Sequence, residues 1–536
     1  MDHITLHLTR PEWQSTEDSS LHMRGTVFLD NTRVPFGDIS GYLPENTKDP
    51  QAWQKSLLGF NGFFALIHQT PSHMVAAVDR VRSIPLFYGQ DNGHFYLSDD
   101  AEWVRQKVGD NEMDPVALEE FQLAGYVTGA DTLFPKVKQL QAGECLHITE
   151  KDQELHIQTH RYYRFLHEEP TQWDENALAN TMDAVVESAI RRLADYANGR
   201  QIVVPLSGGY DSRLIALMLK RIGYKNILTF TYGVPGNKES DYSRRVAEAL
   251  ELPWHFVEYN AEKWRSAWQT DERKDYQRWG SGWSSLPHVQ DWLAIRELKG
   301  AGLLKNDSVL VPGHGVMAIL SHLKSYSGNS NVSASLEYLL KSKFNLSPSH
   351  SGLSNTISSK VGNQLFEEAL DGYDRIGAFV WQEYQSKFLA NSVRVYDYYG
   401  YDWWMPLWDS EFMRFWEQAP LSIRKNKNWY VGQVRNTYQN ATQSRELMGN
   451  AAQSSKMLPV LRFAKNFAPS SLLKIARRYI RRSAANHPLA SPGRFPPDEL
   501  KKLQTSGYLS NGIAAYFFIK ETATSLKQCA HQGRNG

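Results

Sequence analysis

Short apolar runs separated by turn-forming residues dominate the first 165 residues of the chain. Turn chemistry such as Asp91-Asn92-Gly93 falls between runs that favour extended strands. Several short strands joined by tight turns predict mostly antiparallel sheets. Asp114 followed by Pro115 predicts a capped helix that extends to Gly125. The predicted strands cover residues 62–67, 74–78, 86–88 and 94–97.

Beyond residue 175 the pattern changes to strands that alternate with helices. An amphipathic helix is predicted over 175–196, and helices also follow the first two strands of this part. This alternation predicts a parallel, doubly wound sheet, whose ligands lie at the carboxyl ends of the strands. The chain from about residue 315 to 440 reads as helical and is rich in tryptophan and tyrosine. The predicted strands cover 201–206, 226–232, 254–259 and 308–312, with a helix over 241–250.

Composition narrows the functional classes. The 536 residues, 41% of them apolar, favour two domains with buried cores. The 59 basic and 58 acidic side chains give a net charge of +1, which argues against a nucleic acid partner. Two cysteines, Cys145 and Cys529, exclude a disulfide framework and a four-cysteine metal site. With no membrane-length apolar run and no signal peptide in view, we expect a cytoplasmic protein.

The segment after the strand at 201–206 carries the clearest chemistry. It reads Ser207-Gly208-Gly209-Tyr210-Asp211-Ser212 and leads into an apolar-periodic helix. Glycines let the backbone amides turn inward, and the helix presents its positive end. The hydroxyls of Ser207 and Ser212 are donors, and Asp211 is placed to hold magnesium among phosphate oxygens. The segment predicts a loop that binds the pyrophosphate of ATP. The alternative is a plain glycine turn between strand and helix. It lacks the pattern of kinase-type phosphate loops, and it resembles the PP-loop of ATP pyrophosphatases.

Further segments resemble the asparagine synthetase family from about residue 55 to residue 440. The resemblance implies an α/β fold: an N-terminal antiparallel β-rich, Ntn-like α+β domain followed by a doubly wound, HUP-like PP-loop domain. Expected limits are 1–165 for the degenerate class II amidotransferase-like domain, 175–440 for the ATP-binding domain and 441–536 for a basic helical extension. The segments that carry the resemblance are Leu58–Ile67, Val78-Asp79-Arg80, Ile84–Tyr88, Phe134-Pro135, Ala142-Gly143-Glu144, Arg161-Tyr162-Tyr163 and Tyr399–Phe412.

Two departures from the family pattern change the functional reading. The family's glutaminase uses a cysteine at position 2, where this chain has Asp2, and a carboxylate does not replace a thiolate nucleophile. We therefore expect no glutaminase activity. The family's second pyrophosphate loop reads Ser-Gly-Glu-Gly-x-Asp-Glu, whereas this chain has Pro312–Ala318 without any acid. Gly313 and Gly315 remain for phosphate contact. His314 is a candidate phosphate donor or base, or else a satisfied loop histidine.

The resemblance implies a carbon–nitrogen ligase of the asparagine synthase type. A substrate carboxylate attacks the α-phosphate of ATP, pyrophosphate leaves with magnesium, and ammonia or another amine displaces AMP. Lys425 and Lys427 are candidates to contact the acyl-phosphate, with plain surface charge as the alternative. Nitrogen then comes from free ammonia, a separate glutaminase or an amine on the substrate. The residues expected to flank the adenosine are Leu206, Thr231, Tyr232 and Gly233.

The acceptor carboxylate is aspartate by default, or a sugar uronate of surface-polysaccharide synthesis. An amide-ring-forming cyclase and a non-catalytic nucleotide-binding homologue are the alternatives. Four tryptophans are candidates for stacking on a sugar, with core packing as the competing explanation. They are Trp283, Trp292, Trp403 and Trp404.

A basic stretch lies near the C-terminus. Residues 451–497 contain nine lysines and arginines and no acid. Within it, 472–482 predicts a helix with an apolar side and a basic side. That helix is either packed on the core with a solvated basic face, or it makes a peripheral contact with an anionic membrane or substrate carrier.

Overall fold

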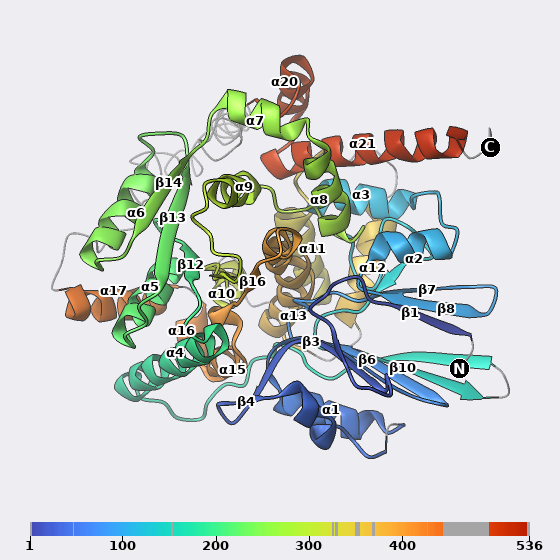
Figure 1. Cartoon of the computed structure of the whole chain (residues 1–536), viewed down its shortest axis with the longest axis horizontal. Coiled ribbons are helices and arrows are strands. Elements are labelled where there is room, and N and C mark those ends of the chain that lie inside the picture. The colour runs from blue at the N-terminus through green and yellow to red at the C-terminus, as the bar shows by residue number, and fades with distance from the viewer. Residues whose placement is uncertain are drawn as a thin grey trace.

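The computed structural model describes residues 3–46, 48–151, 154–323, 326, 331–348, 354–366, 370–425, 427–442 and 493–532. Strands from the first 161 residues form a seven-stranded and a four-stranded sheet, and later strands form a parallel sheet. Figure 1 shows the parallel sheet at the left and the N-terminal sheets at the lower right. The fold is α/β with antiparallel pairing first and parallel pairing later, as the sequence predicts.

The N-terminal sheets pack face to face. The seven-stranded sheet has the order β11-β10-β6-β5-β3-β2, with β4 on β3, and the smaller sheet the order β1-β8-β7-β9. Among the described strands of these two sheets, β1 and β8 are the one parallel pair. The strands are β1 (Ile4–His7), β2 (Gln14–Ser15), β3 (Leu21–Leu29), β4 (Thr32–Val34), β5 (Asn61–Thr70), β6 (His73–Val78), β7 (Phe87–Asp91), β8 (His94–Ser98), β9 (Lys138–Gln139), β10 (Glu144–Lys151) and β11 (Glu154–Arg161).

Strand β5 shows why these sheets are layered. Phe63 and Ala65 face a core shared with Phe95 of β8, whereas Phe64 and Leu66 face a second core. The period of two in a strand therefore buries both faces of the larger sheet. Its outer face is covered by α1, and helices α2 and α3 follow the smaller sheet (Figure 1). The bounds are η1 (Phe36–Tyr42), α1 (Pro50–Gly59), α2 (Ala101–Lys107) and α3 (Pro115–Ala124).

The helix predicted from Asp114 is confirmed, including both ends. The Asp114 carboxylate accepts from the amide of Ala117, Pro115 occupies the first turn, and Gly125 closes the helix with φ = 82°. A side-chain acceptor at the start and a left-handed glycine at the end satisfy backbone groups that a helix leaves unpaired. Local chemistry thus fixes α3.

The second sheet is fully parallel, in the order β14-β13-β12-β15-β16. The helix predicted over 241–250 begins earlier, at Lys238, because the Asn237 side chain caps it. The strand predicted over 308–312 is shorter, since Pro312 has no amide hydrogen to extend the ladder. The strands are β12 (Ile202–Pro205), β13 (Ile227–Gly233), β14 (Trp254–Glu258), β15 (Val309–Leu310) and β16 (Asp402–Trp403).

Helices make up most of the remaining described chain, as predicted. Helix α21 packs on α3, where Phe518 stacks on Phe121 with ring centroids 5.5 Å apart. The helices are α4 (Glu175–Ala197), α5 (Asp211–Arg221), α6 (Lys238–Ala249), α7 (Ala261–Trp268), α8 (Asp271–Ser281), α9 (Trp292–Gly300), α10 (Met317–Leu323), α11 (Val332–Lys343), α12 (Ser354–Phe366), α13 (Gly372–Phe379), η2 (a π-helix, Val380–Leu389), η3 (Ala390–Val393), α14 (Arg394–Tyr398), η4 (Pro406–Trp408), α15 (Ser410–Gln418), α16 (Leu421–Arg424), α17 (Asn428–Thr442), α20 (Pro497–Ser506) and α21 (Ser510–Gln532).

A buried ion pair ties the N-terminal strands to the later helices. Arg192 of α4 donates twice to Asp409, at 2.8 Å from each carboxylate oxygen, and Asn61 of β5 donates to the same carboxylate. Asp409 also caps α15. The Tyr399–Phe412 segment, singled out by its sequence, therefore has a structural role at this contact. The predicted domain limits stay predictions.

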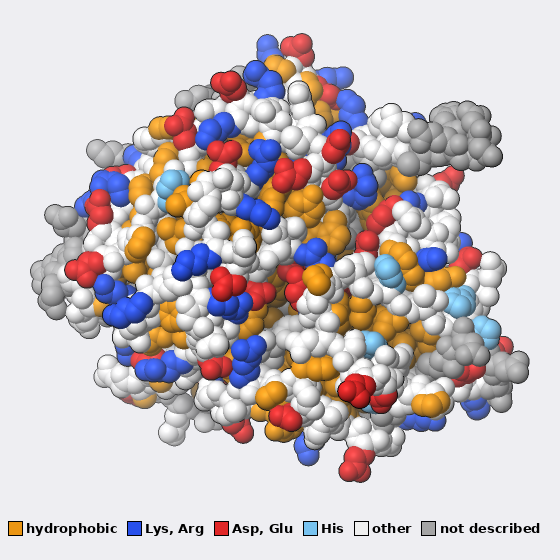
Figure 2. Space-filling view, in the orientation of Figure 1, with side chains coloured by type: hydrophobic (Ala, Val, Ile, Leu, Met, Phe, Trp, Pro, Cys, Tyr) orange, Lys and Arg blue, Asp and Glu red, His pale blue; other side chains and the backbone are white. Residues whose placement is uncertain are grey.

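The surface carries both signs of charge. Figure 2 shows acidic and basic side chains interspersed over the visible face, in keeping with the net charge of +1. Within the described residues, no helix combines the length and apolar character needed to cross a bilayer. The predicted basic helix over 472–482 lies outside the described residues.

Candidate functional site

The loop between β12 and α5 is held in shape by its own serines. The amide of Ser207 donates to the hydroxyl of Ser212 at 3.1 Å, and the two hydroxyls lie 3.0 Å apart. The amide of Gly209 donates to Ser207 Oγ at 3.2 Å. A Cβ on Gly209 would meet that oxygen at 3.1 Å, closer than ordinary contact. The segment thus forms a tight turn at the carboxyl end of β12, where the parallel sheet predicts a ligand.

Asp211 is the first residue of α5 and has an unsatisfied oxygen. Its Oδ1 is buried and makes no hydrogen bond within the described residues. Its Oδ2 lies 3.6 Å from Nζ of Lys427. Burial raises the pKa of Tyr430 well above its usual value, and the charge and contact of the Asp211 carboxylate add to the rise. A carboxylate, an ammonium and a phenol therefore meet at the start of α5.

Helix α17 supplies the part of this site that sequence reasoning missed. Arg435 donates to the hydroxyl of Tyr210 at 2.7 Å from its Nη2, and the guanidinium lies 5.4 Å from the Tyr210 ring. Tyr430, Val434 and Tyr438 are buried at a spacing of four residues, and α17 packs on α5. A spacing of four residues is typical of the packed face of a helix, so this pattern in the sequence could have predicted that α17 packs here.

Gly313 and Gly315 are required by packing. A Cβ on Gly313 would lie 2.8 Å from the amide nitrogen of Ser212, and one on Gly315 would lie 2.3 Å from Cβ of Leu407. Their predicted contact with phosphate stays a prediction. Gly313 lies directly against the phosphate-loop backbone, so the second loop supports the first.

His314 is a satisfied loop histidine, the third of the alternatives considered for it. Its Nε2 lies 2.8 Å from Ser392 Oγ, and Trp408 donates to its Nδ1 at 3.4 Å. Burial, with a smaller contribution from His288, lowers its pKa to about 3. A ring that is neutral at pH 7 with both nitrogens engaged favours the satisfied loop histidine, and a direct role of His314 in the reaction stays a prediction.

The residues expected around the adenosine divide into two groups. Leu206 and Thr231 are buried, and the Thr231 hydroxyl hydrogen-bonds Leu206 O and Ser243. Tyr232 is partly exposed and stacks on Tyr259 at 5.0 Å. Gly233 ends β13. Leu206 and Thr231 therefore pack inside the protein at the carboxyl end of the sheet, whereas the ring of Tyr232 is partly exposed there.

Lys425 and Lys427 lie in different surroundings. Nζ of Lys425 lies 5.1 Å from the centre of the Tyr373 ring, whereas Lys427 pairs with Asp211. The phosphate-loop site therefore includes Lys427. The four tryptophans considered for sugar stacking are at most 6% exposed, which supports core packing; they are Trp283, Trp292, Trp403 and Trp404.

At this site magnesium would need phosphate oxygens as ligands in addition to Asp211. The described residues contain no group of three or more His, Cys, Asp or Glu arranged to hold a metal. The orphaned Oδ1 of Asp211 is nevertheless a hard oxygen of the kind that magnesium prefers. Magnesium usually takes one or two carboxylates together with substrate phosphates, so the single carboxylate suffices for one ion.

Comparisons with known families match two separate stretches of the chain. A family model described as a glutamine amidotransferase domain matches residues 51–163. A second, described as asparagine synthase, matches residues 181–270 and contains the phosphate loop. The two matches together support the resemblance to the asparagine synthetase family. The order of the two matches is that of the two sheet systems.

Individual relatives match over shorter stretches. Asparagine synthetase [glutamine-hydrolyzing] 1 of Bacillus subtilis (strain 168) is 28% identical over 197 residues, which is 36% of this chain and 30% of that protein. Mitochondrial tRNA-specific 2-thiouridylase 1 of Homo sapiens is 33% identical over 88 residues, 15% of this chain and 21% of that one. The chain thus spans less than a third of the length of these curated relatives.

Similar solved structures include an NH3-dependent NAD synthetase from Campylobacter jejuni, at 17% identity and a TM-score of 0.20, covering 28% of this chain and 60% of that one. A glutamine phosphoribosylpyrophosphate amidotransferase from B. subtilis matches at 12% identity and a TM-score of 0.20, covering 57% of this chain and 64% of that one.

Proposed function

We propose that this protein, which resembles the asparagine synthetase family, is an ATP-dependent ligase that converts a substrate carboxylate into an amide. The observation that carries the proposal is the Asp211 carboxylate at the start of α5, whose Oδ1 atom is buried without a hydrogen bond within the described residues, beside the Ser207–Ser212 turn and 3.6 Å from Lys427. An orphaned carboxylate oxygen next to amides and an ammonium suits a phosphate chain that arrives with a cation. The match to the asparagine synthase model over residues 181–270 supports it.

The proposed reaction has two steps. A carboxylate oxygen of the substrate attacks the α-phosphorus of ATP, and the bond from that phosphorus to the pyrophosphate oxygen breaks. Ammonia or another amine then attacks the acyl carbon, and AMP leaves with the electrons of the carbon–oxygen bond. The amine loses a proton to solvent. Electrostatic stabilisation of the leaving pyrophosphate is the main task of the protein.

The chain's residues have defined roles in this proposal. The Gly209 amide and the Ser207 and Ser212 hydroxyls orient the β- and γ-phosphates, and Lys427 neutralises charge that develops on pyrophosphate. Asp211 would hold magnesium, which supplies further charge neutralisation when bound. Asp2 leaves the N-terminal domain without a glutaminase nucleophile, so we propose free ammonia, a separate glutaminase or a substrate amine as the nitrogen source.

The acceptor is proposed to be aspartate or a sugar uronate, with an internal amine, and so ring closure, as the alternative. A cytoplasmic location and the membrane contact of 472–482 remain predictions. A non-catalytic nucleotide-binding homologue is the second candidate function, favoured by the engaged, neutral His314 in a loop that carries no acid.

The test is ATP–pyrophosphate exchange with Asp211→Asn. The variant keeps the shape of the side chain, so we expect an unchanged fold by circular dichroism and a fall in exchange of at least about 100-fold. Asp241→Asn, on the exposed surface of α6, is the matched control and keeps full exchange. Assays run with aspartate or a uronic acid, and with ammonia or glutamine. Exchange that persists in Asp211→Asn refutes the assignment, whereas tight ATP binding without pyrophosphate release in the native chain selects the non-catalytic homologue.

A further inference from the structure

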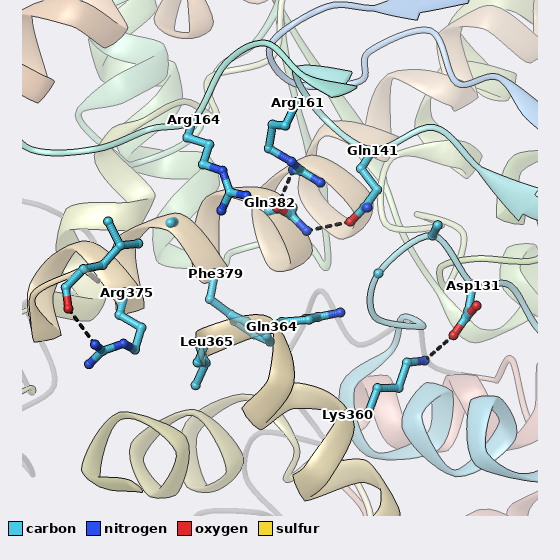
Figure 3. Close-up of a pocket in the computed structure, with 14 residues that line it drawn as sticks. Asp131, Gln141, Arg161, Arg164, Lys360, Gln364, Leu365, Arg375, Phe379 and Gln382 are labelled. Carbon is cyan, nitrogen blue, oxygen red and sulfur yellow. Dashed lines mark hydrogen bonds and ion pairs between the residues drawn. The ribbon is translucent and has the colours of Figure 1, made fainter. Parts of the chain in front are cut away.

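A pocket lies at the junction between the N-terminal domain and the later helices, away from the residues assigned to ATP. Its volume is about 300 Å³, within the range of small-molecule sites. One wall comes from residues 129–164, and the other comes from α12, α13 and the π-helix η2. Figure 3 shows side chains from both walls pointing into the same space. We call it the junction pocket.

Basic side chains dominate the lining. Arg161, Arg164, Lys360 and Arg375 line the junction pocket, against Asp131 as the one carboxylate among its lining residues. Figure 3 shows Arg161 and Arg164 descending toward Gln382, with Lys360 and Asp131 across the space. The surface that this cavity presents is therefore cationic.

Three carboxylates balance two of these cations, and one of them, the pocket-lining Asp131, pairs with Lys360 at 2.9 Å. Lys360 pairs with Glu120 at 2.7 Å, and Glu120 is fully buried. Arg161 pairs with Glu144 at 3.6 Å, and Glu144 is 4% exposed. These pairs fix the two cations in place at the wall of the cavity. Fixed cations lose little conformational freedom when an anion binds.

The remaining lining defines what else a ligand carries. Leu365 and Phe379 contribute an apolar patch next to the cations. The Oε1 atom of Gln364 is buried and accepts no hydrogen bond within the described residues. An orphaned acceptor in a lining that also holds guanidinium donors suits a ligand that carries a hydroxyl or amine as well as acidic groups.

We propose that the junction pocket binds a small organic oxyanion with more than one acidic oxygen, either a dicarboxylate or a phosphate ester. The planar forks of Arg161 and Arg164 match the paired oxygens of a carboxylate or phosphate. The apolar patch receives the carbon skeleton, and Gln364 accepts from its hydroxyl or amine. Neither the amidotransferase chemistry nor the adenylation chemistry requires this site.

Occupancy of the pocket stabilises the contact between the two parts of the chain. The amide of Gly129, which lines the pocket, donates to both oxygens of Glu383 at 3.2 Å. Lys387 donates to Val127 O at 3.0 Å and pairs with Glu383 at 2.5 Å. The 127–129 loop is therefore tied to η2 beside the pocket. A ligand that contacts both walls favours the folded, closed junction and raises Tm.

The experiment uses the full chain with succinate, glycerol 3-phosphate and inorganic phosphate as probes. Binding is measured by isothermal titration calorimetry and by Tm, at constant ionic strength. We expect saturable binding of at least one organic probe, tighter than inorganic phosphate, and a rise in Tm. Preference between succinate and glycerol 3-phosphate distinguishes the carboxylate source from the phosphate source.

Variants locate the binding. Arg164→Gln removes one fork and weakens binding by about tenfold or more. Gln364→Leu removes the orphaned acceptor and selectively weakens probes that carry a hydroxyl. Arg191→Gln, an exposed arginine on α4, is the matched control and keeps native affinity. Asp211→Asn also keeps it, because that residue belongs to the phosphate loop. Absence of saturation at millimolar probe, equal affinity in Arg164→Gln and Arg191→Gln, or loss in Asp211→Asn alone each overturns the proposal.

Discussion

The substitution Gly313→Ala probes the contact between the second loop and the phosphate loop. A Cβ at this position would lie 2.8 Å from the Ser212 amide nitrogen, 2.9 Å from its Cβ and 3.0 Å from its Cα. The first distance is about 0.6 Å short of ordinary van der Waals contact, which begins at 3.4 Å. Two of the three obstructing atoms are backbone. The clash is therefore relieved only by moving the start of α5.

The expected cost separates activity from stability. A shift of about half an ångström moves the Ser212 amide and hydroxyl relative to the pyrophosphate, and misplacement on this scale costs about 10- to 100-fold in rate. Overpacking of one methyl group costs about 1–3 kcal/mol of unfolding free energy. The free energy of unfolding is measured by urea denaturation, and the rate by ATP–pyrophosphate exchange. Gly313 has no left-handed φ, so the effect is steric.

Gly300→Ala is the control for this prediction. Gly300 ends α9, and a Cβ there meets no atom within 4 Å. Alanine favours a helix over glycine by up to about 1 kcal/mol, so we expect equal or greater stability and native exchange. Native exchange in Gly313→Ala, with stability reduced or not, would refute the reasoning that this glycine positions the phosphate loop.

Two further predictions concern stability. Arg192→Ala leaves the buried Asp409 carboxylate without its guanidinium, so we expect urea denaturation to show a loss of about 3–5 kcal/mol in the free energy of unfolding. The control Arg191→Ala removes an exposed arginine and changes this free energy by less than about 0.5 kcal/mol. Similar values for both variants would contradict the role of the pair. Burial lowers the pKa of His73 and of His147 to about 4, so the unfolded chain binds protons first as the pH falls. Stability is therefore fully present above pH 6.5 and declines toward pH 4, by up to about 1.4 kcal/mol per pH unit for each histidine, and His147→Gln flattens the decline. An unchanged slope in that variant would exclude His147 as a cause.

Local chemistry explains the parts of the fold that the sequence predicts well. The runs at 62–67 and 74–78 became β5 and β6 because alternate residues face two cores. The Asp114 cap and the Gly125 terminator placed both ends of α3. The strand–loop–helix around Ser207–Ser212 was also foreseeable, since glycine, serine and the helix start act within a few residues.

Contacts between distant segments explain what the sequence pattern alone does not show. Gly313 and Gly315 read as phosphate-binding glycines, yet Ser212 and Leu407 are what they contact. Lys427 and Tyr430 reach Asp211 only because α17 packs on α5. The junction pocket is lined by residues more than 200 positions apart, so no spacing along the chain predicts it.

The Ser207–Ser212 loop and the Pro312–Ala318 loop differ in how much of the family's phosphate-binding pattern they keep. This difference affects how the proposed ligase would neutralise pyrophosphate. The first loop keeps its donors and its carboxylate, whereas the second keeps only the glycines that packing requires, beside a neutral His314 and a buried Met317. A site with one carboxylate holds fewer cations than a site with several. Lys427, at 3.6 Å from Asp211, offers fixed positive charge in the same place. On the proposed function, the ammonium of Lys427, the residue before α17, thus takes part of the task that acidic residues and their metal would otherwise perform.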